Sequence, residues 1–290
     1  MKILLIGKTG QLGSDILRNG IAVHDIFAPE REILDIGYLE SIEKAVMSCK
    51  PEIVINTAAF HNVPLCETEY AAAFKINCMA VKELARCSKK IGALFITFST
   101  DYVFDGKKRT PYFEDDEPAP LQIYGISKLA GEYAAMSVWP DKTIIIRTCG
   151  LYGISGAKSK SGNFVDKRLL DVETNKYLEI SCDQTVCPTY TDDLSKAILQ
   201  LIGKETIKPG VYHLVNEGEC TWYDFTKAIF EIIEFDAEVK PVDRKGLSDD
   251  MRRPLYSAMA NTKAKALGVV LPYWRNALER YLNIKYLNRW

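Results

Sequence analysis

Short apolar runs alternate with longer amphipathic stretches along the first half of the chain. Runs with strand character cover residues 2–6, 22–27, 53–56, 94–99 and 142–147. Helical periodicity occupies the intervals between them, at residues 12–19, 37–48, 71–91 and 124–138. Strands that are apolar on both faces and separated by helices favour a mostly parallel sheet covered on both sides. The first half therefore predicts a doubly wound α/β domain.

The alternation weakens after Gly150. Residues 153–162 are rich in Gly, Ser and Lys, which predicts a surface loop. Helical patterns follow at 164–173, 192–202, 222–234 and 273–283, with extended pieces at 177–180 and 211–215. We expect residues 1–150, completed by parts of about 183–216, to form a Rossmann domain, and residues 151–290 to form mainly a smaller α/β cap.

A glycine-rich turn joins the first expected strand to the first expected helix. It has the sequence Gly7-Lys8-Thr9-Gly10-Gln11-Leu12-Gly13. Glycines allow a tight turn and let a pyrophosphate approach the backbone, and the helix N-terminus offers unpaired N–H groups with a partial positive charge. Because a strand precedes the turn and a helix follows it, we expect a dinucleotide cofactor here, bound by Gly7, Thr9, Gly10, Gln11, Leu12 and Gly13.

The end of the second expected strand carries groups that could contact the adenosine ribose. The segment His24-Asp25-Ile26-Phe27-Ala28-Pro29-Glu30-Arg31 offers a carboxylate suited to the free ribose of NAD and, at Arg31, a guanidinium suited to the 2′-phosphate of NADP. An ordinary surface charge explains Arg31 almost as well. The sequence therefore favours NADPH slightly and leaves NADH open.

A strand end and a helix start supply the expected catalytic chemistry. Ser99-Thr100-Asp101-Tyr102 ends the fourth strand, and Tyr124 and Lys128 lie four residues apart on one face of the next helix. An ammonium near a phenol, with a cationic nicotinamide, lowers a tyrosine pKa from about 10 toward the range useful for proton transfer. We expect Thr100 to hold the substrate oxygen, so that Thr100, Tyr124 and Lys128 form the catalytic set.

With these motifs the chain resembles the extended short-chain dehydrogenase/reductase family over most of its length. Within that family, Ser-Thr-Asp-Tyr-Val-Phe-Asp-Gly at 99–106 and Tyr-Gly-Ile-Ser-Lys-Leu-Ala-Gly-Glu at 124–132 are similar to segments of the dTDP-4-dehydrorhamnose reductases. The resemblance implies NAD(P)H-dependent reduction of the 4-keto group of a nucleotide-activated deoxysugar, such as dTDP-4-dehydro-L-rhamnose to dTDP-L-rhamnose. It is also compatible with a homodimer.

The same resemblance assigns roles to individual residues. It implies that the cofactor is lined, beyond the glycine-rich turn, by Arg31, Asp35, Ile36, Ala58, Ala59, Phe60, Tyr124 and Lys128. It implies substrate contacts from Thr100, Asp101, Tyr102, Asn163, Arg253 and Ser257, of which Asn163, Arg253 and Ser257 would touch the nucleotide end.

One residue separates this chain from a neighbouring activity. Sugar-nucleotide dehydratases of the family carry an Asp-Glu pair directly after the threonine, because removal of water needs an acid and a base besides the tyrosine. Here Asp101 is followed by Tyr102. The remaining groups support ketone reduction, with a hydride from the nicotinamide and a proton from Tyr124.

The chain also departs from the related reductases. These usually have a tryptophan in an Arg-Thr-x-Trp-x-Tyr run, where this chain has Gly150, so we expect a bulky wall of the sugar pocket to be missing. They tend to have Val-Asp-Lys where this chain has Val63-Pro64-Leu65, and the loop at 153–162 is longer and more basic. These changes affect the shape and charge of the pocket, so the sugar and the nucleotide stay open.

Two alternatives remain. The protein could reduce a different nucleotide-sugar, or it could be a non-catalytic NADP-binding subunit similar to the regulatory β subunit of methionine adenosyltransferase, which resembles the same reductases. The intact Thr100, Tyr124 and Lys128 favour an enzyme.

Charge and composition exclude other classes of protein. Lys plus Arg (37) nearly cancel Asp plus Glu (38), which leaves no field to hold nucleic acid or an anionic membrane. No apolar run approaches the roughly 20 residues that span a bilayer or forms a signal-peptide core, so we expect a cytoplasmic protein. Eight cysteines without a CxxC pair, and three histidines, predict reduced thiols and no metal site.

Overall fold

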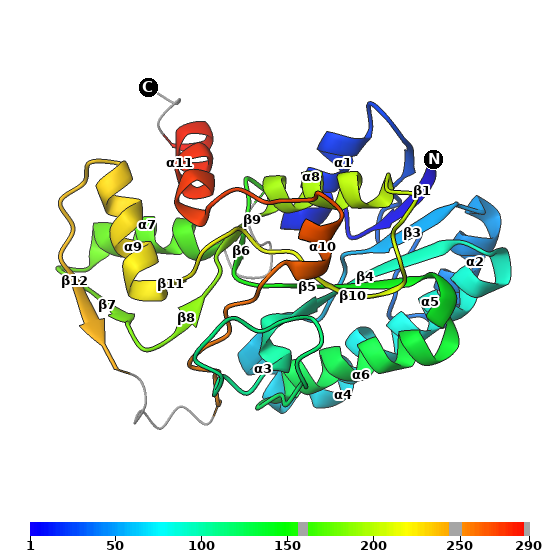
Figure 1. Cartoon of the computed structure of the whole chain (residues 1–290), viewed down its shortest axis with the longest axis horizontal. Coiled ribbons are helices and arrows are strands. Elements are labelled where there is room, and N and C mark those ends of the chain that lie inside the picture. The colour runs from blue at the N-terminus through cyan, green and yellow to red at the C-terminus, as the bar shows by residue number, and fades with distance from the viewer. Residues whose placement is uncertain (156–161, 244–250, 287–290) are drawn as a thin grey trace.

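A six-stranded parallel sheet forms the centre of the computed structural model, which describes residues 1–155, 162–243 and 251–286 (Figure 1). The strand order is β10-β5-β4-β3-β1-β2. In that order the strands are Gly210–His213, Thr143–Thr148, Leu94–Thr100, Ile53–Asn56, Lys2–Ile6 and Asp25–Phe27. The order reverses beside β1, because β2 lies on one side of it and β3 on the other. This topology confirms the predicted doubly wound fold, in which ligands bind at the carboxyl ends of the strands.

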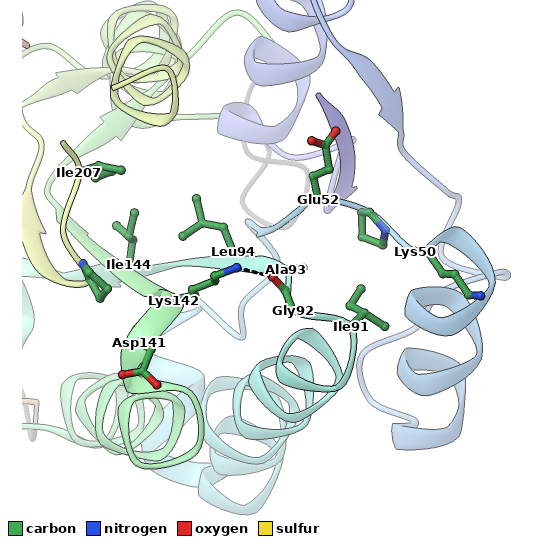
Figure 2. A pocket seen from close by; sticks show the side chains of 12 residues that line it. Lys50, Glu52, Ile91, Gly92, Ala93, Leu94, Asp141, Lys142, Ile144 and Ile207 are labelled. Atoms are coloured by element: carbon green, nitrogen blue, oxygen red, sulfur yellow. Dashed lines mark hydrogen bonds between the residues drawn. The ribbon is translucent and has the colours of Figure 1, made fainter. Parts of the chain in front are cut away.

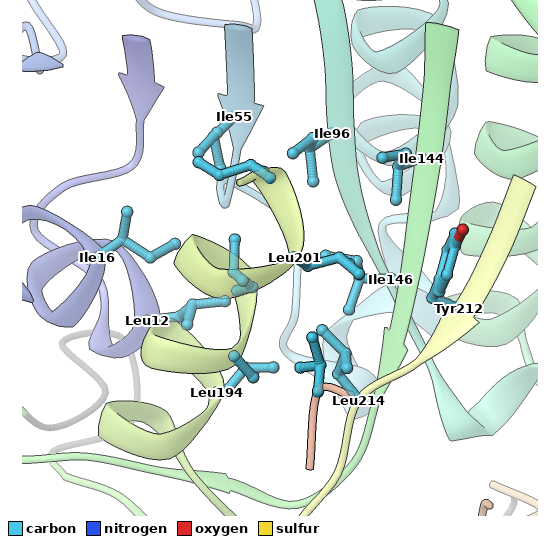
Figure 3. Packing of buried hydrophobic residues seen from close by; sticks show 14 of the residues in the cluster. Leu12, Ile16, Ile55, Ile96, Ile144, Ile146, Leu194, Leu201, Tyr212 and Leu214 are labelled. Atoms are coloured by element: carbon cyan, nitrogen blue, oxygen red, sulfur yellow. The ribbon is translucent and has the colours of Figure 1, made fainter. Parts of the chain in front are cut away.

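Helices cover both faces of the sheet. One face is packed by α1 (Gln11–Gly20), α8 (Thr191–Ile202) and α10 (Thr262–Ala266), and the other by α2 (Leu39–Cys49), α5 (Ala80–Ile91) and α6 (Ile123–Val138). Figure 3 shows the first of these two cores, where side chains of α1 and α8 point toward the strands: Leu12, Ile16, Leu194 and Leu201 against Ile55, Ile96, Ile144 and Ile146. The two apolar layers hold the carboxyl ends of the strands in fixed positions.

Elements from the second half of the chain form a smaller cap beside the carboxyl ends of β4 and β5 (Figure 1). Its helices are α7 (Phe164–Thr174), α9 (Trp222–Ile232) and α11 (Trp274–Lys285). Its strands pair as β6 (Leu151–Tyr152) with β9 (Thr189–Tyr190), β7 (Leu178–Ser181) with β12 (Val239–Val242), and β8 (Thr185–Val186) with β11 (Cys220–Thr221). An aromatic cluster around Tyr152, Tyr190, Phe225 and Tyr281 forms the core of the cap.

The chain crosses between the sheet and the cap several times. It enters the cap after β5, returns through α8 and β10, and crosses again before α10 and α11. The segment that leads into α10 bridges both parts, because Tyr256 pairs with Thr185 of the cap and Met259 pairs with Tyr112 of the main domain. The expected domain boundaries stay a prediction, since the two parts share elements from both halves of the chain.

The single helix expected at 71–91 is divided in the structure. It consists of α4 (Tyr70–Phe74), one π-helical turn (Lys75–Met79) and α5, and a further short helix, α3 (Val63–Thr68), precedes it. Gly131 of α6 approaches this turn so closely that a Cβ there would lie 2.0 Å from the Asn77 carbonyl oxygen. Apolar periodicity continues through the extra residue, so the sequence pattern did not reveal the π turn.

Other boundaries shift for local reasons. The strand expected at 22–27 begins only at Asp25, because the backbone N–H groups of Val23 and His24 donate to the Gly20 carbonyl. The helix expected at 37–48 begins at Leu39, since the Asp35 carboxylate accepts the Gly37 N–H. The extended piece expected at 177–180 is confirmed as β7, whereas the other short strands of the cap were not expected, because two to four residues carry too little periodicity.

Candidate active site

The turn after β1 forms an open cradle. Gly7 has a φ of +87°, in the left-handed region, and a Cβ on Gly13 would lie 2.1 Å from the Gly7 carbonyl oxygen. Gly10 precedes α1, whose first turn has no acidic residue and, in the described part of the chain, no side-chain cap. The N–H groups of this turn and their partial positive charge are therefore available to an anion.

The residues of this turn fit a dinucleotide. Thr9 and Gly10 are exposed at the mouth of the cradle, whereas Leu12 is buried in the core beneath it. Gln11 reaches the cap, where its Nε2 donates to the Leu151 carbonyl at 3.4 Å. The fit rests on the close Gly7–Gly13 contact, which only glycine allows. The part that each residue takes in holding a cofactor stays a prediction.

Charged side chains follow β2 on the expected ribose side. Arg31 Nε donates to Asp35 Oδ2 at 2.9 Å, and the Arg31 side chain is 82% exposed. Asp35 is held more firmly, because its Oδ1 accepts the Gly37 N–H at 2.8 Å and Ile36 beside it is buried. Arg31 can therefore reach a phosphate in solvent by giving up one exposed hydrogen bond.

Asn77 in the π-helical turn connects the expected cofactor loop to the catalytic helix. Its side chain accepts the Phe60 N–H and donates to the Phe60 carbonyl, each at 2.9 Å, and also donates to Ser127 Oγ at 3.0 Å. Phe60 follows the partly exposed Ala58 and Ala59 after β3. Sequence reasoning missed Asn77, because a polar residue within a helical pattern gives no sign of a π turn.

Thr100 and Tyr124 lie together at the carboxyl edge of the sheet, with Lys128 one helical turn after Tyr124. Thr100 ends β4, and Tyr124 and Lys128 lie in the first turns of α6. Thr100 and Lys128 are buried, Tyr124 is half-buried, and the Thr100 hydroxyl is within hydrogen-bonding reach of the Tyr124 phenol. The Tyr102 ring meets the Tyr124 ring edge to face, with centroids 6.2 Å apart.

Burial controls the protonation of this set. Burial, and then the charge of Asp101, raises the pKa of Tyr124. Burial also lowers the pKa of Lys128 to about 8, with Glu132 acting in the opposite direction. In this structure burial and the charge of Asp101 dominate the Tyr124 pKa, and the expected lowering by Lys128 together with a cationic nicotinamide stays a prediction. A raised pKa keeps the phenol protonated at neutral pH, as a proton donor requires.

Asp101 accepts hydrogen bonds from three side chains. Thr100 Oγ1 donates to its Oδ1 at 2.9 Å, and Ser257 Oγ and Cys149 Sγ donate to its Oδ2 at 2.6 and 3.1 Å. Burial raises the pKa of Asp101, and these donors oppose that effect. Asp101 and Ser257 were both expected to touch substrate, and here they bond to each other. Their substrate contacts stay predictions.

The other expected substrate residues occupy different surroundings. Asn163 caps α7, with its Oδ1 accepting the Asp166 N–H and its Nδ2 donating to the Gly153 carbonyl and to the Tyr281 hydroxyl. Both amide protons of Asn163 are therefore engaged inside the cap. Burial raises the pKa of Tyr102, and the charge of Arg253 acts in the opposite direction.

A tryptophan of the cap lies beside the position where the expected tryptophan is missing. Gly150 has a φ of +55°, and a Cβ there would lie 3.2 Å from the Trp222 ring. Trp222 begins α9, and its ring stacks on Phe164 with centroids 4.4 Å apart. The aromatic side chain that residue 150 lacks is therefore present nearby on another element. Residues 156–161 of the expected surface loop lie outside the described residues.

A separate hollow of about 670 Å³ lies at the opposite, amino-terminal edge of the sheet (Figure 2). Lys50, Glu52, Asp141 and Lys142 line it, and Lys142 Nζ donates to the Gly92 carbonyl at 2.8 Å. Because ligands of doubly wound sheets bind at the carboxyl ends of the strands, we assign no role to this hollow.

Three further observations bear on other sites. All eight cysteines are free thiols, and Cys182 is exposed. Within residues 1–155, 162–243 and 251–286, no cluster of His, Cys, Asp and Glu side chains could hold a metal ion. No helix in those same ranges is long and apolar enough to cross a membrane.

The chain is similar over nearly its whole length to a polysaccharide biosynthesis protein and to dTDP-4-dehydrorhamnose reductases. It is 36% identical to the spore coat polysaccharide biosynthesis protein SpsK of Bacillus subtilis, covering 97% of this chain and 96% of that protein. A crystal structure of a dTDP-4-dehydrorhamnose reductase from Clostridium acetobutylicum superposes with a TM-score of 0.91 at 34% identity, covering 98% and 99% of the two chains.

A second solved structure carries a cofactor. The dTDP-4-dehydrorhamnose reductase of Bacillus anthracis, in complex with NADP, superposes with a TM-score of 0.90 at 32% identity, covering 97% and 98% of the two chains. A family model for the RmlD substrate binding domain matches residues 1–287. The chain therefore belongs to the RmlD substrate binding domain family.

Proposed function

We propose that the protein is an NADPH-dependent oxidoreductase that converts dTDP-4-dehydro-L-rhamnose to dTDP-L-rhamnose. The observation that carries the proposal is the placement of Thr100, Tyr124 and Lys128 at the carboxyl edge of a sheet that also carries the glycine cradle. The full-length similarity to two dTDP-4-dehydrorhamnose reductases supports it.

The side chains of the set divide the work of ketone reduction. The nicotinamide, when bound, supplies the hydride to C4 of the sugar. Tyr124 donates its phenolic proton to the 4-keto oxygen, which becomes the hydroxyl of the product, and its raised pKa keeps that proton in place beforehand. Lys128, on the same helix face, stabilises the phenolate that remains until solvent returns a proton. Thr100 lies beside the phenol and orients the substrate oxygen.

Binding would be divided between the two parts of the molecule. Residues 1–150 would hold the cofactor, with its pyrophosphate at the N-terminus of α1 and its 2′-phosphate near Arg31. The cap would hold the sugar nucleotide, with Arg253 supplying positive charge beside Tyr102. The resemblance to the reductase family also leads us to propose a homodimer, which analytical ultracentrifugation would test.

The test is NADPH and NADH oxidation, followed at the absorbance of reduced nicotinamide, with enzymatically prepared dTDP-4-dehydro-L-rhamnose. Turnover by the wild-type chain that is lost in Tyr124→Phe, with NADPH affinity retained, would support the proposal. No turnover of this or any other 4-keto nucleotide-sugar, with tight NADPH binding retained, would overturn it in favour of a non-catalytic NADP-binding subunit.

A further inference from the structure

We propose that Asp101 is a positioning residue, which couples the cap to the catalytic hydroxyl of Thr100 through Ser257. The inference rests on the proposed reductase activity and deepens it. It assigns Asp101 and Ser257 a part in the orientation of Thr100.

The hydrogen-bonding capacity of Thr100 explains why its orientation depends on Asp101. A threonine hydroxyl has one proton and two lone pairs. The proton is directed to Asp101 Oδ1 at 2.9 Å, and the Tyr102 N–H occupies one lone pair at 3.2 Å. One lone pair is left, and the Tyr124 phenol is within reach. Asp101 therefore sets the rotation of the hydroxyl and the direction of the free lone pair.

The second oxygen of Asp101 is held from the cap side. Ser257 Oγ donates to Oδ2 at 2.6 Å, and the Ser257 N–H donates to the Thr185 carbonyl of β8 at 2.9 Å. The bridge between Tyr112 and Met259 ties the same segment to the main domain. A displacement of the cap relative to the sheet would therefore act on the Asp101 carboxylate, and through it on Thr100.

The Asp101 carboxylate and Ser257 are enclosed by protein on all sides that the bonds above describe. Asp101 is 4% exposed and Ser257 is fully buried. Cys149 Sγ, from the turn after β5, adds a third donor to the carboxylate at 3.1 Å. The two oxygens thus face donors from three separate segments, an arrangement that fixes a carboxylate in place.

The first experiment compares two buried serines of the cap. Ser257→Ala removes the donor to Asp101, and the matched control Ser181→Ala removes a buried serine that donates to Asp183 at the same distance of 2.6 Å, away from the site. We expect Ser257→Ala to lower kcat about tenfold while KM and the NADPH Kd change less than about twofold, and Ser181→Ala to leave kcat within about twofold of wild type. Asp101→Asn should lower kcat at least as much as Ser257→Ala.

Two outcomes would overturn the inference. Equal kcat values for Ser257→Ala and Ser181→Ala would show that the Ser257 bond does not act on the chemistry. A raised KM for the sugar with unchanged kcat would assign Ser257 to substrate binding instead.

A second experiment needs no substrate. Urea unfolding gives the unfolding equilibrium constants of Thr100→Val, Ser257→Ala and the double variant. Each is measured once in the wild-type background and once in the Asp101→Asn background. We expect the double variant to change the unfolding equilibrium constant by a factor that differs at least about threefold from the product of the two single-variant factors. In the Asp101→Asn background this difference should vanish. A double-variant factor equal to that product would refute the coupling, whether or not the wild-type chain reduces a nucleotide-sugar. Failure of the wild-type chain to reduce any nucleotide-sugar would refute only the proposed function.

Discussion

Arg147, near the end of β5, and Glu132, one turn after Lys128 in α6, form a bidentate ion pair in the interior of the protein. Arg147 Nε and Nη2 donate to the two carboxylate oxygens of Glu132 at 3.0 and 2.6 Å, and each side chain is 4% exposed. The pair joins the catalytic helix to the central sheet. It also places a negative charge beneath Lys128, where it opposes the lowering of the Lys128 pKa by burial.

Glu132→Gln should cost the protein about 3–5 kcal/mol in unfolding free energy, because Arg147 would stay buried without its counter-ion. Urea unfolding measures this loss. The control is Glu83→Gln, which breaks the partly exposed pair with Arg86 on α5 and should cost no more than about 1 kcal/mol. Equal losses for the two variants would contradict a special role for the buried pair.

Gly13→Ala should remove the cofactor cradle. Its Cβ would lie 2.1 Å from the Gly7 carbonyl oxygen, so the turn must open. We expect NADPH affinity to fall at least about tenfold, a loss of about 1.4 kcal/mol, measured by calorimetric titration. Gly203→Ala is the matched control, because its nearest neighbour would be 3.5 Å away and its conformation is helical. Unchanged NADPH binding by Gly13→Ala would count against the cradle.

Arg31→Ala tests the cofactor preference. If Arg31 contacts the 2′-phosphate, the ratio of kcat/KM for NADPH to that for NADH should fall about tenfold, the worth of one charged hydrogen bond. Arg275→Ala removes an exposed, ion-paired arginine of the cap and should leave the ratio unchanged. An equal effect of Arg31→Ala on both cofactors would instead indicate that the Arg31–Asp35 bond is structural.

His213 should make the protein sensitive to acid. Burial, followed by the charge of Arg147, lowers its pKa to about 3. Between about pH 6.5 and pH 3 the unfolded chain binds a proton at this residue and the folded chain does not, so stability falls as the pH decreases through that window. His213→Asn keeps a donor for the Tyr112 carbonyl and removes the titration.

Between about pH 3 and 6.5 the free energy of unfolding of His213→Asn should therefore depend less steeply on pH than that of wild type. The difference in slope corresponds to the uptake of up to one proton on unfolding. Denaturant titrations at a series of pH values give this slope. Identical slopes for the two proteins would show that His213 has the same proton affinity in the folded state as in the unfolded state.

The sequence by itself determined the architecture and predicted a catalytic set. Alternating apolar runs and amphipathic stretches predicted the doubly wound sheet, because burial on both faces leaves its mark on every strand. The glycine-rich turn, Thr100, Tyr124 and Lys128 lie at element ends, so their spacing along the chain already placed them at one edge of the sheet. Periodicity also located most helices to within a few residues.

Only the tertiary structure decided how these residues are supported. Asn77, Ser257 and Trp222 reach the site from segments far apart in the sequence, and no local pattern marks such contacts. The protonation of Tyr124 also depends on the fold, because burial and the neighbouring charge of Asp101 act through space. Local pattern records which side of an element is buried, whereas hydrogen bonds between distant segments and the loss of solvent around a charge exist only once the chain has folded.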